Sequence, residues 1–181
     1  MFVGKMRIIG GKYGGRNLQV GKGLPVRPTT DRTKEALFNI LEHRVDWSET
    51  SVLDLFCGTG NISLECVSRG AASVLSVDRH RKCIQSIKNN MKTLGSEEPK
   101  LIASDVKKFL KNCGDNFDLI FMDPPYAMAG QEALIEMIFE KNILAPEGIL
   151  ILEHSSTLSF SSLNNFVELR KYGSSHLSFF E

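Results

Sequence analysis

The chain has 181 residues, 42% of them hydrophobic, which fits one globular domain with a substantial core. It contains no apolar run of transmembrane length and no secretory leader, so we expect a cytoplasmic protein without a membrane partner. The four cysteines lack CxxC and Cys/His ligand spacings, which argues against a zinc site and a disulfide framework, and we expect no bound metal.

The net charge of +1 is unevenly distributed. Residues 1–30 carry six basic and no acidic side chains, whereas the remainder carries 16 of the 22 basic and all 21 acidic ones. A basic segment on a slightly acidic body predicts a polyanion such as RNA, bound through its phosphates, although a solvated basic hairpin would have the same composition. Tyr13 is available to stack on a base. The candidate RNA contacts are Arg7, Lys12, Arg16, Arg27 and, in the following helix, Arg32.

The glycine-rich segment at residues 6–20 predicts two short strands joined by turns. We expect it to form a basic β-hairpin arm within residues 1–30 that contacts RNA, followed by a single domain at residues 31–181. The regular alternation of strands and helices begins only at Val52. We therefore expect the domain to fold without residues 1–24.

Strands and helices alternate through most of that domain. This alternation predicts parallel strands with crossover helices on both faces, a doubly wound Rossmann-like α/β sheet. The last two strands are joined by only three residues, a link that permits only an antiparallel hairpin, so the sheet has seven mostly parallel strands and an antiparallel C-terminal strand. The pattern predicts helices at residues 32–44, 61–69, 81–94, 106–111 and 131–144, and strands at 52–56, 74–78, 101–103, 119–123, 149–153, 167–172 and 176–180.

The ends of the first three parallel strands carry glycines and acids. Gly58 and Gly60 let the backbone approach a ligand, but Ser63 stands where a GxGxxG motif has its third glycine. Asp78 follows Gly60 by 18 residues and can accept both ribose hydroxyls of an adenosine-bearing cofactor. Asp105, after the third strand, can accept from an adenine amino group, although each acid alone could instead cap a helix. The candidate cofactor contacts are Asp54, Phe56, Gly58, Gly60, Asp78, Asp105 and Asp123.

The fourth strand ends abruptly in Asp-Pro-Pro-Tyr. The prolines lack N–H donors and fix φ, so the carbonyls around them point in set directions. A carboxylate, a carbonyl and an aromatic ring together suit a planar heterocycle with an exocyclic amino group, although Pro-Pro is also an ordinary way to stop a strand. The candidate catalytic residues are Asp123, Pro124, Pro125 and Tyr126.

With these motifs at successive strand ends, the chain resembles class I S-adenosylmethionine (AdoMet) methyltransferases, whose last strand is antiparallel. Four segments make the likeness closer: Arg-Ile-Ile-Gly-Gly at residues 7–11, Arg-Pro-Thr-Thr-Asp-Arg at 27–32, Ala-Leu-Phe-Asn at 36–39, and Phe-Asp-Leu ahead of Asp-Pro-Pro-Tyr. Over nearly its whole length the chain is similar to the bacterial 16S ribosomal RNA guanine-N2-methyltransferase family, RsmD type.

The resemblance implies a monomeric enzyme with AdoMet as its cofactor. Its substrate would be a guanine N2 amine of 16S rRNA, in the assembled or assembling small ribosomal subunit. Asp123 and the Pro124 carbonyl would bind the amine, and Tyr126 would stack on the flipped-out base. Two positions depart from the family pattern: His80 replaces a second acid after Asp78, and Ser63 replaces a glycine, which predicts slightly looser helix–strand packing.

Three other functions are compatible with parts of the sequence. A DNA N6-adenine or N4-cytosine methyltransferase uses the same motif, but generally needs a sizeable target-reading domain, and only about fifty residues precede the core. A nicotinamide oxidoreductase would use the glycines and Asp78 but would leave Asp-Pro-Pro-Tyr unexplained. A non-catalytic RNA-binding assembly factor would explain the basic arm but predicts a decayed active site.

Overall fold

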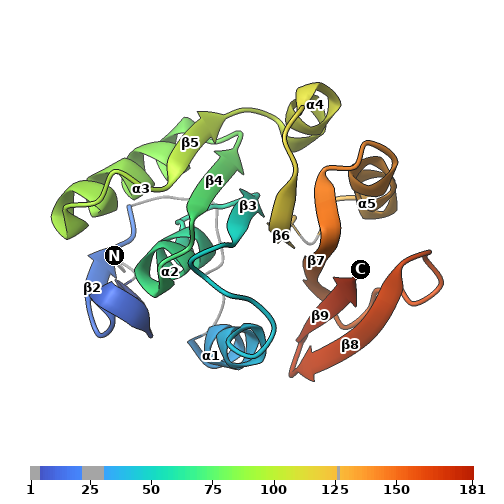
Figure 1. Cartoon of the computed structure of the whole chain (residues 1–181), viewed down its shortest axis with the longest axis horizontal. Helices are drawn as coiled ribbons and strands as arrows, with labels where there is room; N and C mark the ends of the chain where they lie inside the picture. Colours follow the sequence, from blue (N-terminus) through green and yellow to red (C-terminus); the bar gives the residue numbers. More distant parts are fainter. Residues whose placement is uncertain (1–4, 22–30, 126) are drawn as a thin grey trace.

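The computed structural model describes residues 5–21, 31–125 and 127–181. Two candidate site residues, Arg27 and Tyr126, lie outside the described residues. The elements in chain order are β1 (Lys5–Arg7), η1 (Gly11–Tyr13), β2 (Asn17–Gln19), α1 (Asp31–Leu41), β3 (Ser51–Leu55), α2 (Asn61–Arg69), β4 (Ser73–Asp78), α3 (Arg81–Leu94), β5 (Lys100–Ala103), α4 (Val106–Asn112), β6 (Phe117–Met122), α5 (Gln131–Glu140), β7 (Leu144–Ser155), β8 (Phe166–Tyr172) and β9 (Ser175–Phe180) (Figure 1).

Within the described residues, seven strands form one sheet in the order β5-β4-β3-β6-β7-β9-β8, and β1 pairs with β2 in a separate antiparallel ribbon (Figure 1). Strands β3 to β7 pair in parallel, whereas β9 pairs antiparallel with β7 on one side and with β8 on the other. The predicted doubly wound, mostly parallel sheet with an antiparallel C-terminal strand and a small N-terminal hairpin is confirmed.

The bounds of two predicted helices, α2 and α3, match the structure residue for residue. Helix α5 ends at Glu140, and the apolar residues expected to extend it to position 144 instead lead into β7. Asn142 has φ 53°, a left-handed conformation that turns the chain out of the helix, while the Ile143 N–H closes back on the Ile138 carbonyl at 2.9 Å. The predicted end of this helix at residue 144 is therefore wrong, because the apolar residues after Glu140 lead into β7 and do not continue α5.

Each face of the sheet buries a hydrophobic cluster, because alternate side chains of a strand point to opposite faces. Leu53 and Leu55 of β3 pack toward α4 and α5, together with Met122 and Leu152. Val52 of β3 packs on the other face, in a cluster that joins β6, β7 and β9 to α1 and α2. Helices therefore cover both faces of the sheet, and the ends of the strands lie outside these two helix layers.

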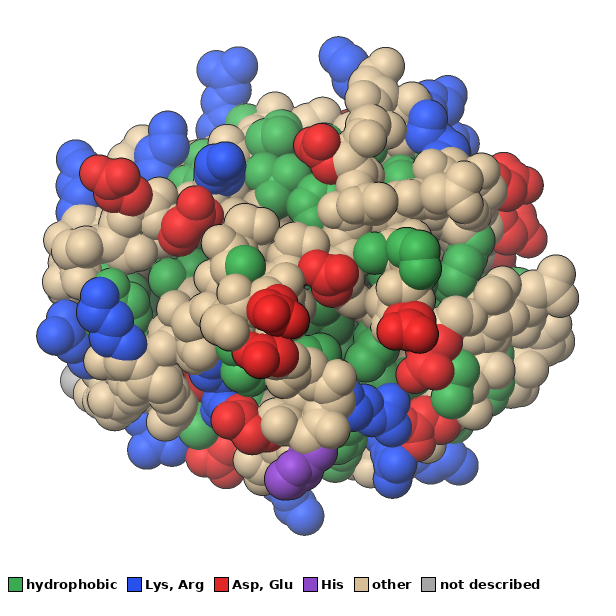
Figure 2. Space-filling view, viewed as in Figure 1, with side chains coloured by type: hydrophobic (Ala, Val, Ile, Leu, Met, Phe, Trp, Pro, Cys, Tyr) green, Lys and Arg blue, Asp and Glu red, His purple; other side chains and the backbone are tan. Residues whose placement is uncertain are grey.

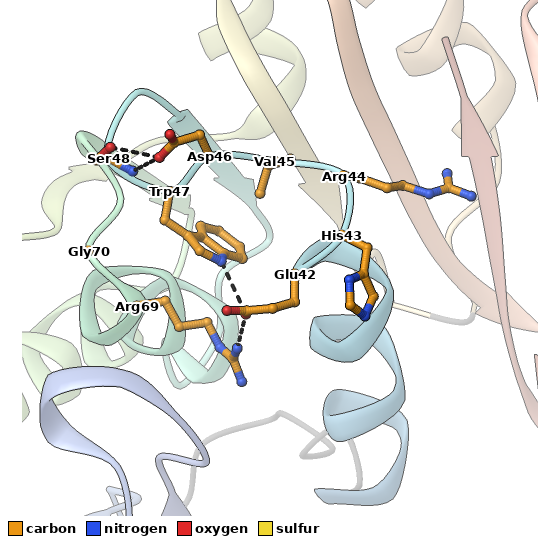
Figure 3. A pocket seen from close by; sticks show the side chains of 9 residues that line it. All are labelled: Glu42, His43, Arg44, Val45, Asp46, Trp47, Ser48, Arg69 and Gly70. Carbon is orange, nitrogen blue, oxygen red and sulfur yellow. Dashed lines mark hydrogen bonds and ion pairs between the residues drawn. The ribbon is translucent and has the colours of Figure 1, made fainter.

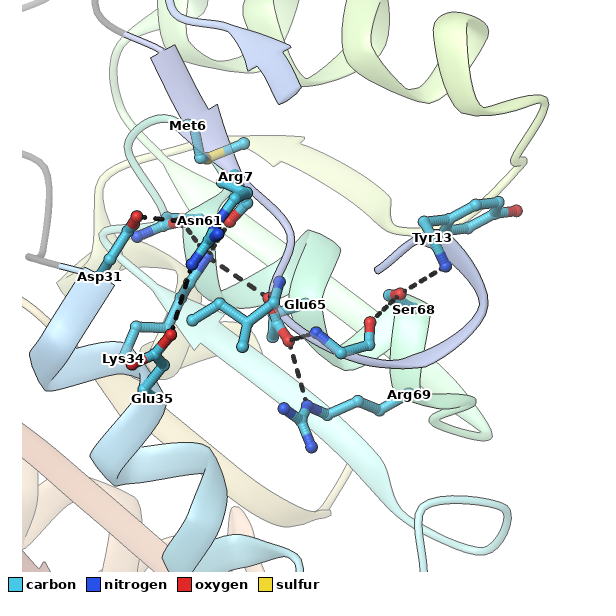
Figure 4. A network of polar contacts seen from close by, with 12 residues as sticks. Met6, Arg7, Tyr13, Asp31, Lys34, Glu35, Asn61, Glu65, Ser68 and Arg69 are labelled. Atoms are coloured by element: carbon cyan, nitrogen blue, oxygen red, sulfur yellow. Dashed lines mark hydrogen bonds and ion pairs between the residues drawn. The ribbon is translucent and has the colours of Figure 1, made fainter. Parts of the chain in front are cut away.

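The N-terminal ribbon packs against the domain (Figure 4). Its buried side chains meet Leu64 of α2 and Ile87 of α3; they are Met6, Ile8, Tyr13 and Leu18. Gly11 has φ 73°, and a Cβ there would lie 1.9 Å from the Ser68 carbonyl oxygen, so the close approach to α2 requires glycine.

A fully buried ion pair fastens this ribbon to α1 and α2 (Figure 4). The Glu65 carboxylate accepts from the backbone N–H groups of Ile9 and Gly10 at 2.8 Å each. Lys34 Nζ lies 3.4 Å from Glu65 and donates to the Arg7 carbonyl at 2.6 Å and to Asn61 Oδ1 at 2.8 Å. The three N–H groups of the ammonium thus each have an acceptor, which a buried charge requires.

The cysteines and the hydropathy of the helices can be described for the residues that the structure covers. Cys57, Cys66 and Cys83 are buried free thiols, Cys113 is partly buried, and none is in a disulfide. Burial raises the pKa of the Cys57 and Cys66 thiols well above the usual value. In the part of the chain that the structure describes, every helix is too short or too polar to cross a membrane.

Candidate active site

The carboxyl ends of four parallel strands bring the candidate residues into one row. Leu55 of β3 is level with Val77 of β4 and with Met122 of β6, and Met122 is level with Leu152 of β7. The next residues along these strands are therefore aligned as well. They are Asp78, Phe56, Asp123 and Glu153, and we call these four residues the strand-end row. Ligands of open α/β sheets bind at this edge.

The loop after β3 is tightly folded. Phe56, Gly58 and Gly60 have φ values of 60°, 51° and 78°, so the backbone turns through the left-handed region at each of them. A Cβ on Gly60 would lie 2.8 Å from Cγ1 of Ile87. A non-glycine residue such as Phe56 is strained there, and such strain clusters at functional sites.

Asp54 is fully inside the protein and holds the start of α2. Its Oδ2 accepts from the Ser63 N–H at 3.0 Å and from the Ser63 hydroxyl, and Ser76 of β4 donates to that hydroxyl at 2.7 Å. Burial raises the pKa of Asp54 to about 7, against the lowering effect of these hydrogen bonds. Ser63 thus joins α2 to β3 and β4, so the expected loosening at this position is wrong.

Asp78 is buried, and the backbone fixes its orientation. The Gly58 N–H donates to Oδ2 at 2.9 Å, and the His80 N–H donates to Oδ1 at 2.7 Å. Each carboxylate oxygen has capacity for another donor. Only the backbone N–H of His80 bonds to Asp78 in these contacts. The His80 ring instead accepts from Arg79 Nε at 3.2 Å.

Asp105 follows β5 and is exposed. It caps α4, since its Oδ1 accepts from the Lys108 N–H at 3.0 Å. The residue therefore has a structural role in addition to the cofactor contact expected for it. It lies next to the Asp78 strand, because Asp78 is level with Ala103.

Asp123 is partly buried at the end of β6, with Pro124 buried and Pro125 exposed after it. The Pro125 carbonyl accepts from the Met128 N–H at 2.8 Å, which closes a turn. Burial raises the pKa of Asp123 well above its usual value, and the nearby Glu153 and Asp54 raise it further.

Glu153 was not assigned a role from the sequence. It is 5% exposed, and its Oε1 accepts from the Ser175 hydroxyl at 2.6 Å. The available signal was its position at the end of the apolar run 149–152, which repeats the pattern of the other acid-tipped strands. Among the described residues, no group of three or more His, Cys, Asp or Glu side chains is arranged to hold a metal ion.

The candidate RNA contacts differ in their surroundings. Arg7 lies 3.4 Å from Glu35 and 3.9 Å from Asp31, whereas Arg32 is exposed at the start of α1. Lys12 and Arg16 lie 5.2 and 5.4 Å from the centre of the Tyr13 ring. Because that ring is only 5% exposed and packs in the core, the expectation that Tyr13 is available to stack on a base is wrong.

A surface hollow of about 590 Å³ lies away from the strand-end row (Figure 3). It is formed after α1 and before β3, at the opposite edge of the sheet. Glu42 lies at its centre and accepts from Trp47 Nε1 at 3.4 Å and from Arg69 Nη1 at 2.5 Å (Figure 3). These groups satisfy one another, and none belongs to the strand-end row.

The chain is similar to known proteins over most of its length. A family model described as "Conserved hypothetical protein 95" matches residues 6–181. The chain is 34% identical over 150 residues to ribosomal RNA small subunit methyltransferase D of Escherichia coli K12, covering 83% of this chain and 75% of that protein. The protein of the same name from Haemophilus influenzae is 33% identical over 172 residues, with 93% and 88% covered.

Solved structures extend the comparison. A hypothetical protein from Thermus thermophilus is similar with a TM-score of 0.85 and 31% identity, covering 97% of this chain and 99% of that one. A 16S rRNA N2 G1207 methyltransferase of T. thermophilus, solved with AdoMet and guanosine, has a TM-score of 0.77 and covers 99% of this chain and 50% of its own. Its 20% identity supports the shared fold alone. The chain therefore belongs to the "Conserved hypothetical protein 95" family, together with the ribosomal RNA small subunit methyltransferase D proteins.

Proposed function

We propose that this protein is an AdoMet-dependent methyltransferase that modifies the N2 amine of a guanine in 16S rRNA. The observation that carries the proposal is the row of Asp78, Phe56, Asp123 and Glu153 at the carboxyl edge, within a family that includes rRNA methyltransferases. The match to relatives named for rRNA supports the RNA class, and Asp-Pro-Pro-Tyr supports an exocyclic amine as the acceptor.

The row suits the adenosine half of AdoMet. Asp78 is held rigidly by two backbone N–H groups, so its remaining acceptor positions can meet both ribose hydroxyls. Gly58 and Gly60 allow the backbone close to the ligand, and Phe56 lies beside them, while Asp54 positions this loop through Ser63. We assign Asp105, exposed beyond β5, to the adenine amino group.

AdoMet, when bound, supplies a methyl group activated by a positively charged sulfonium. The protein must then activate and aim a poor nucleophile, because the N2 lone pair of guanine is delocalised into the ring. Hydrogen bonds from the amine to the Asp123 carboxylate and the Pro124 carbonyl would favour a tetrahedral nitrogen and orient its lone pair, so positioning would supply much of the rate. The nitrogen would form the new bond to the methyl group as S-adenosylhomocysteine leaves, and it would then lose a proton to Asp123 or to water. We assign Tyr126 to stacking on the flipped-out base.

A basic surface formed by the ribbon and α3 suits the RNA backbone. The Gln19 N–H of β2 donates to Asn90 Oδ1 of α3 at 3.2 Å, which joins the ribbon to that helix. Lys12 and Arg16 lie by the Tyr13 ring, and the Tyr13 N–H donates to Ser68 near the end of α2. In Figure 2, Lys and Arg side chains project from the edge of the molecule over α3 and β2. Helix α3 contains no acidic residue, and its exposed basic side chains are Arg81, Lys82, Lys88 and Lys92.

These side chains would contact phosphates, together with Arg27 and Arg32. Arg7 would contribute less to phosphate binding, because the nearby carboxylates of Glu35 and Asp31 offset its positive charge. We propose that the protein acts as a monomer. The substrate would be 16S rRNA within the assembled or assembling small subunit.

The test is methyl transfer from labelled AdoMet to small subunits that lack the modification, followed by nucleoside analysis. We expect label in N2-methylguanosine of 16S rRNA, and nearly abolished transfer by an Asp123→Ala variant. Label in methyladenine or methylcytosine, or in DNA, would contradict the assigned target. Binding of NAD with no binding of S-adenosylhomocysteine in calorimetry would contradict the cofactor.

A further inference from the structure

Glu153 of β7 lies beside Asp123 of β6. Met122 and Leu152 are level in the parallel pairing and both pack toward α4 and α5. The residues that follow them therefore lie toward the opposite face, on strands that are about 4.8 Å apart. Glu153 is 5% exposed and is held by the Ser175 hydroxyl, so a carboxylate is built into the interior next to Asp123.

The described charged groups that act on Asp123 are both acidic. Glu153 acts from β7 and Asp54 from β3, and together with burial they raise the pKa of Asp123. From α1, the Lys34 ammonium is engaged by Glu65, Asn61 and a backbone carbonyl. From β9, Ser175 contributes a hydroxyl group.

His154 and His176 are not among the charged groups that act on Asp123. His154 alternates to the other face of β7, where its ring contacts the Ser178 hydroxyl at 2.8 Å and Phe160. Burial lowers the pKa of His154, which keeps the ring neutral at neutral pH. The His176 ring lies 5.8 Å from it and lowers that pKa further.

Two adjacent carboxylates, here buried Glu153 and partly buried Asp123, cannot both ionise at ordinary cost, and such pairs lose their protons in two coupled steps. We propose that Asp123 and Glu153 share one proton in the cofactor-free protein, and that Glu153 thereby sets the pH at which Asp123 can accept from the substrate amine. Glu153 is a positioning residue, since it acts through Asp123. The shared proton leaves to solvent when the pH rises, or when a cation binds at the edge and favours the doubly ionised pair.

The catalytic part of this inference rests on the proposed function, but its electrostatic part is a property of the free protein. The native pair holds a proton that the unfolded chain, with carboxyl pKa values of about 4, has already released above that pH. The free energy of unfolding must therefore fall as the pH rises from about 4 through the raised pKa of the pair. Removing one carboxylate should make that fall smaller, because burial and Asp54 still raise the pKa of Asp123 when Glu153 is neutral.

The first experiment measures the melting temperature against pH without cofactor or RNA. Glu153→Gln keeps an acceptor for the Ser175 hydroxyl but removes the repulsion. We expect its melting temperature to exceed that of the wild type by about 2–5 °C at pH 8 and to converge with it toward pH 4. Glu136→Gln, which removes an exposed acid on α5, is the matched control and should leave the profile unchanged.

A second variant keeps the test decisive if Glu153→Gln does not fold. Asp123→Asn relieves the same repulsion and should raise the melting temperature at pH 8 in the same way. The double variant should add little to either single one, because one repulsion is removed in all three. A lower melting temperature of either folded variant at pH 8, a pH-independent difference, or additive effects would overturn the inference.

The second experiment measures methyl transfer to small subunits against pH. We expect the acid limb of the Glu153→Gln profile to lie at lower pH than that of the wild type, because Asp123 then loses its proton more easily. An unchanged acid limb in an active enzyme would overturn the catalytic part. If no RNA were methylated by the wild type, the proposed function would fail, while the melting profiles would still decide whether the pair shares a proton.

Discussion

The strand-end row and the N-terminal ribbon differ in how their residues are brought together. In the row, each residue lies at or near the carboxyl end of its own strand, and the parallel pairing of neighbouring strands aligns the four residues. In the ribbon, the Gly10 N–H finds its acceptor on Glu65, 55 residues further along the chain. Local patterns therefore locate the first region, whereas the second depends on contacts that no local pattern announces.

The N-terminal ribbon is an integrated part of the domain. The sequence suggested an arm that the domain could lose, but the ribbon supplies the partners of a buried ion pair and part of a hydrophobic cluster. It also reaches the loop after β3, since the Thr59 hydroxyl lies 3.6 Å from the sulfur of Met6. The segment that we propose to contact RNA thus also supports the loop that we propose to bind the cofactor.

The largest effect is expected in the strand-end row. Asp123→Ala and Asp123→Asn should lower methyl transfer by about 10²–10⁴-fold, because the amine loses its carboxylate acceptor. Calorimetry should show that AdoMet still binds. Asp115→Asn removes an exposed acid just before β6 and should leave turnover unchanged. A near wild-type rate in either Asp123 variant would remove this residue from the site.

The ribbon should respond in stability. Lys34→Met leaves Glu65 buried with Arg69 Nε, at 3.2 Å, as its one remaining cationic partner among the residues that the structure describes. Breaking a buried pair typically costs about 3–5 kcal/mol of unfolding free energy, which urea denaturation measures. Lys88→Met on the exposed side of α3 should change it by less than about 0.5 kcal/mol.

Deleting residues 1–24 should destabilise the domain for the same reason, since the Glu65 and Lys34 partners on the ribbon are removed together. We expect a lower urea midpoint and weaker AdoMet binding. This replaces the expectation from the sequence. A truncated protein with full stability and full AdoMet affinity would show that the ribbon is a separable arm after all.

A smaller effect separates two neighbours within the row. Asp78→Ala should weaken AdoMet binding by about 1.5–3 kcal/mol, the range for hydrogen bonds to a charged group. His80→Ala should change it little, because the contact of His80 with the Asp78 carboxylate uses the backbone N–H. Calorimetry on both variants decides, and a greater loss in His80→Ala would reverse the assignment.

The smallest effect concerns the basic surface. Arg16→Gln or Lys88→Gln should flatten the salt dependence of RNA binding by about 0.7–0.9 log units for each phosphate that the variant no longer neutralises. Arg7→Gln should flatten it less, because Glu35 and Asp31 already offset this charge. Binding titrations over a range of salt concentrations test the ranking. Equal slopes in all three variants and the wild type would place RNA on another face.

The sheet and most of the row could be predicted because their signals are local. The period of the apolar residues gave α2 and α3 their bounds, and acids after apolar runs marked Asp78 and Asp123. Glu153 carried the same signal, but its neighbour becomes evident only from the pairing of β6 with β7. Its role required the register as well as the sequence.

The remaining errors have particular physical causes. The end of α5 depends on the left-handed conformation of Asn142. The residue type alone does not reveal this conformation, because asparagine also occurs within helices. Ser63 looked like a defect in a glycine motif until its hydroxyl was found between Asp54 and Ser76. Tyr13 looked exposed because it lies between glycines and basic residues, whereas its ring is buried.

The position of β9 has a consequence for folding during synthesis. β9 lies between β7 and β8, so β8 has no neighbour in the sheet until β9 has been made. Until then the edge of β7 is open and prone to pair with other chains. Insertion of β9 buries Phe179 and Phe180 in the clusters on opposite faces. One late step therefore completes both halves of the core and closes the aggregation-prone edge of the nascent chain.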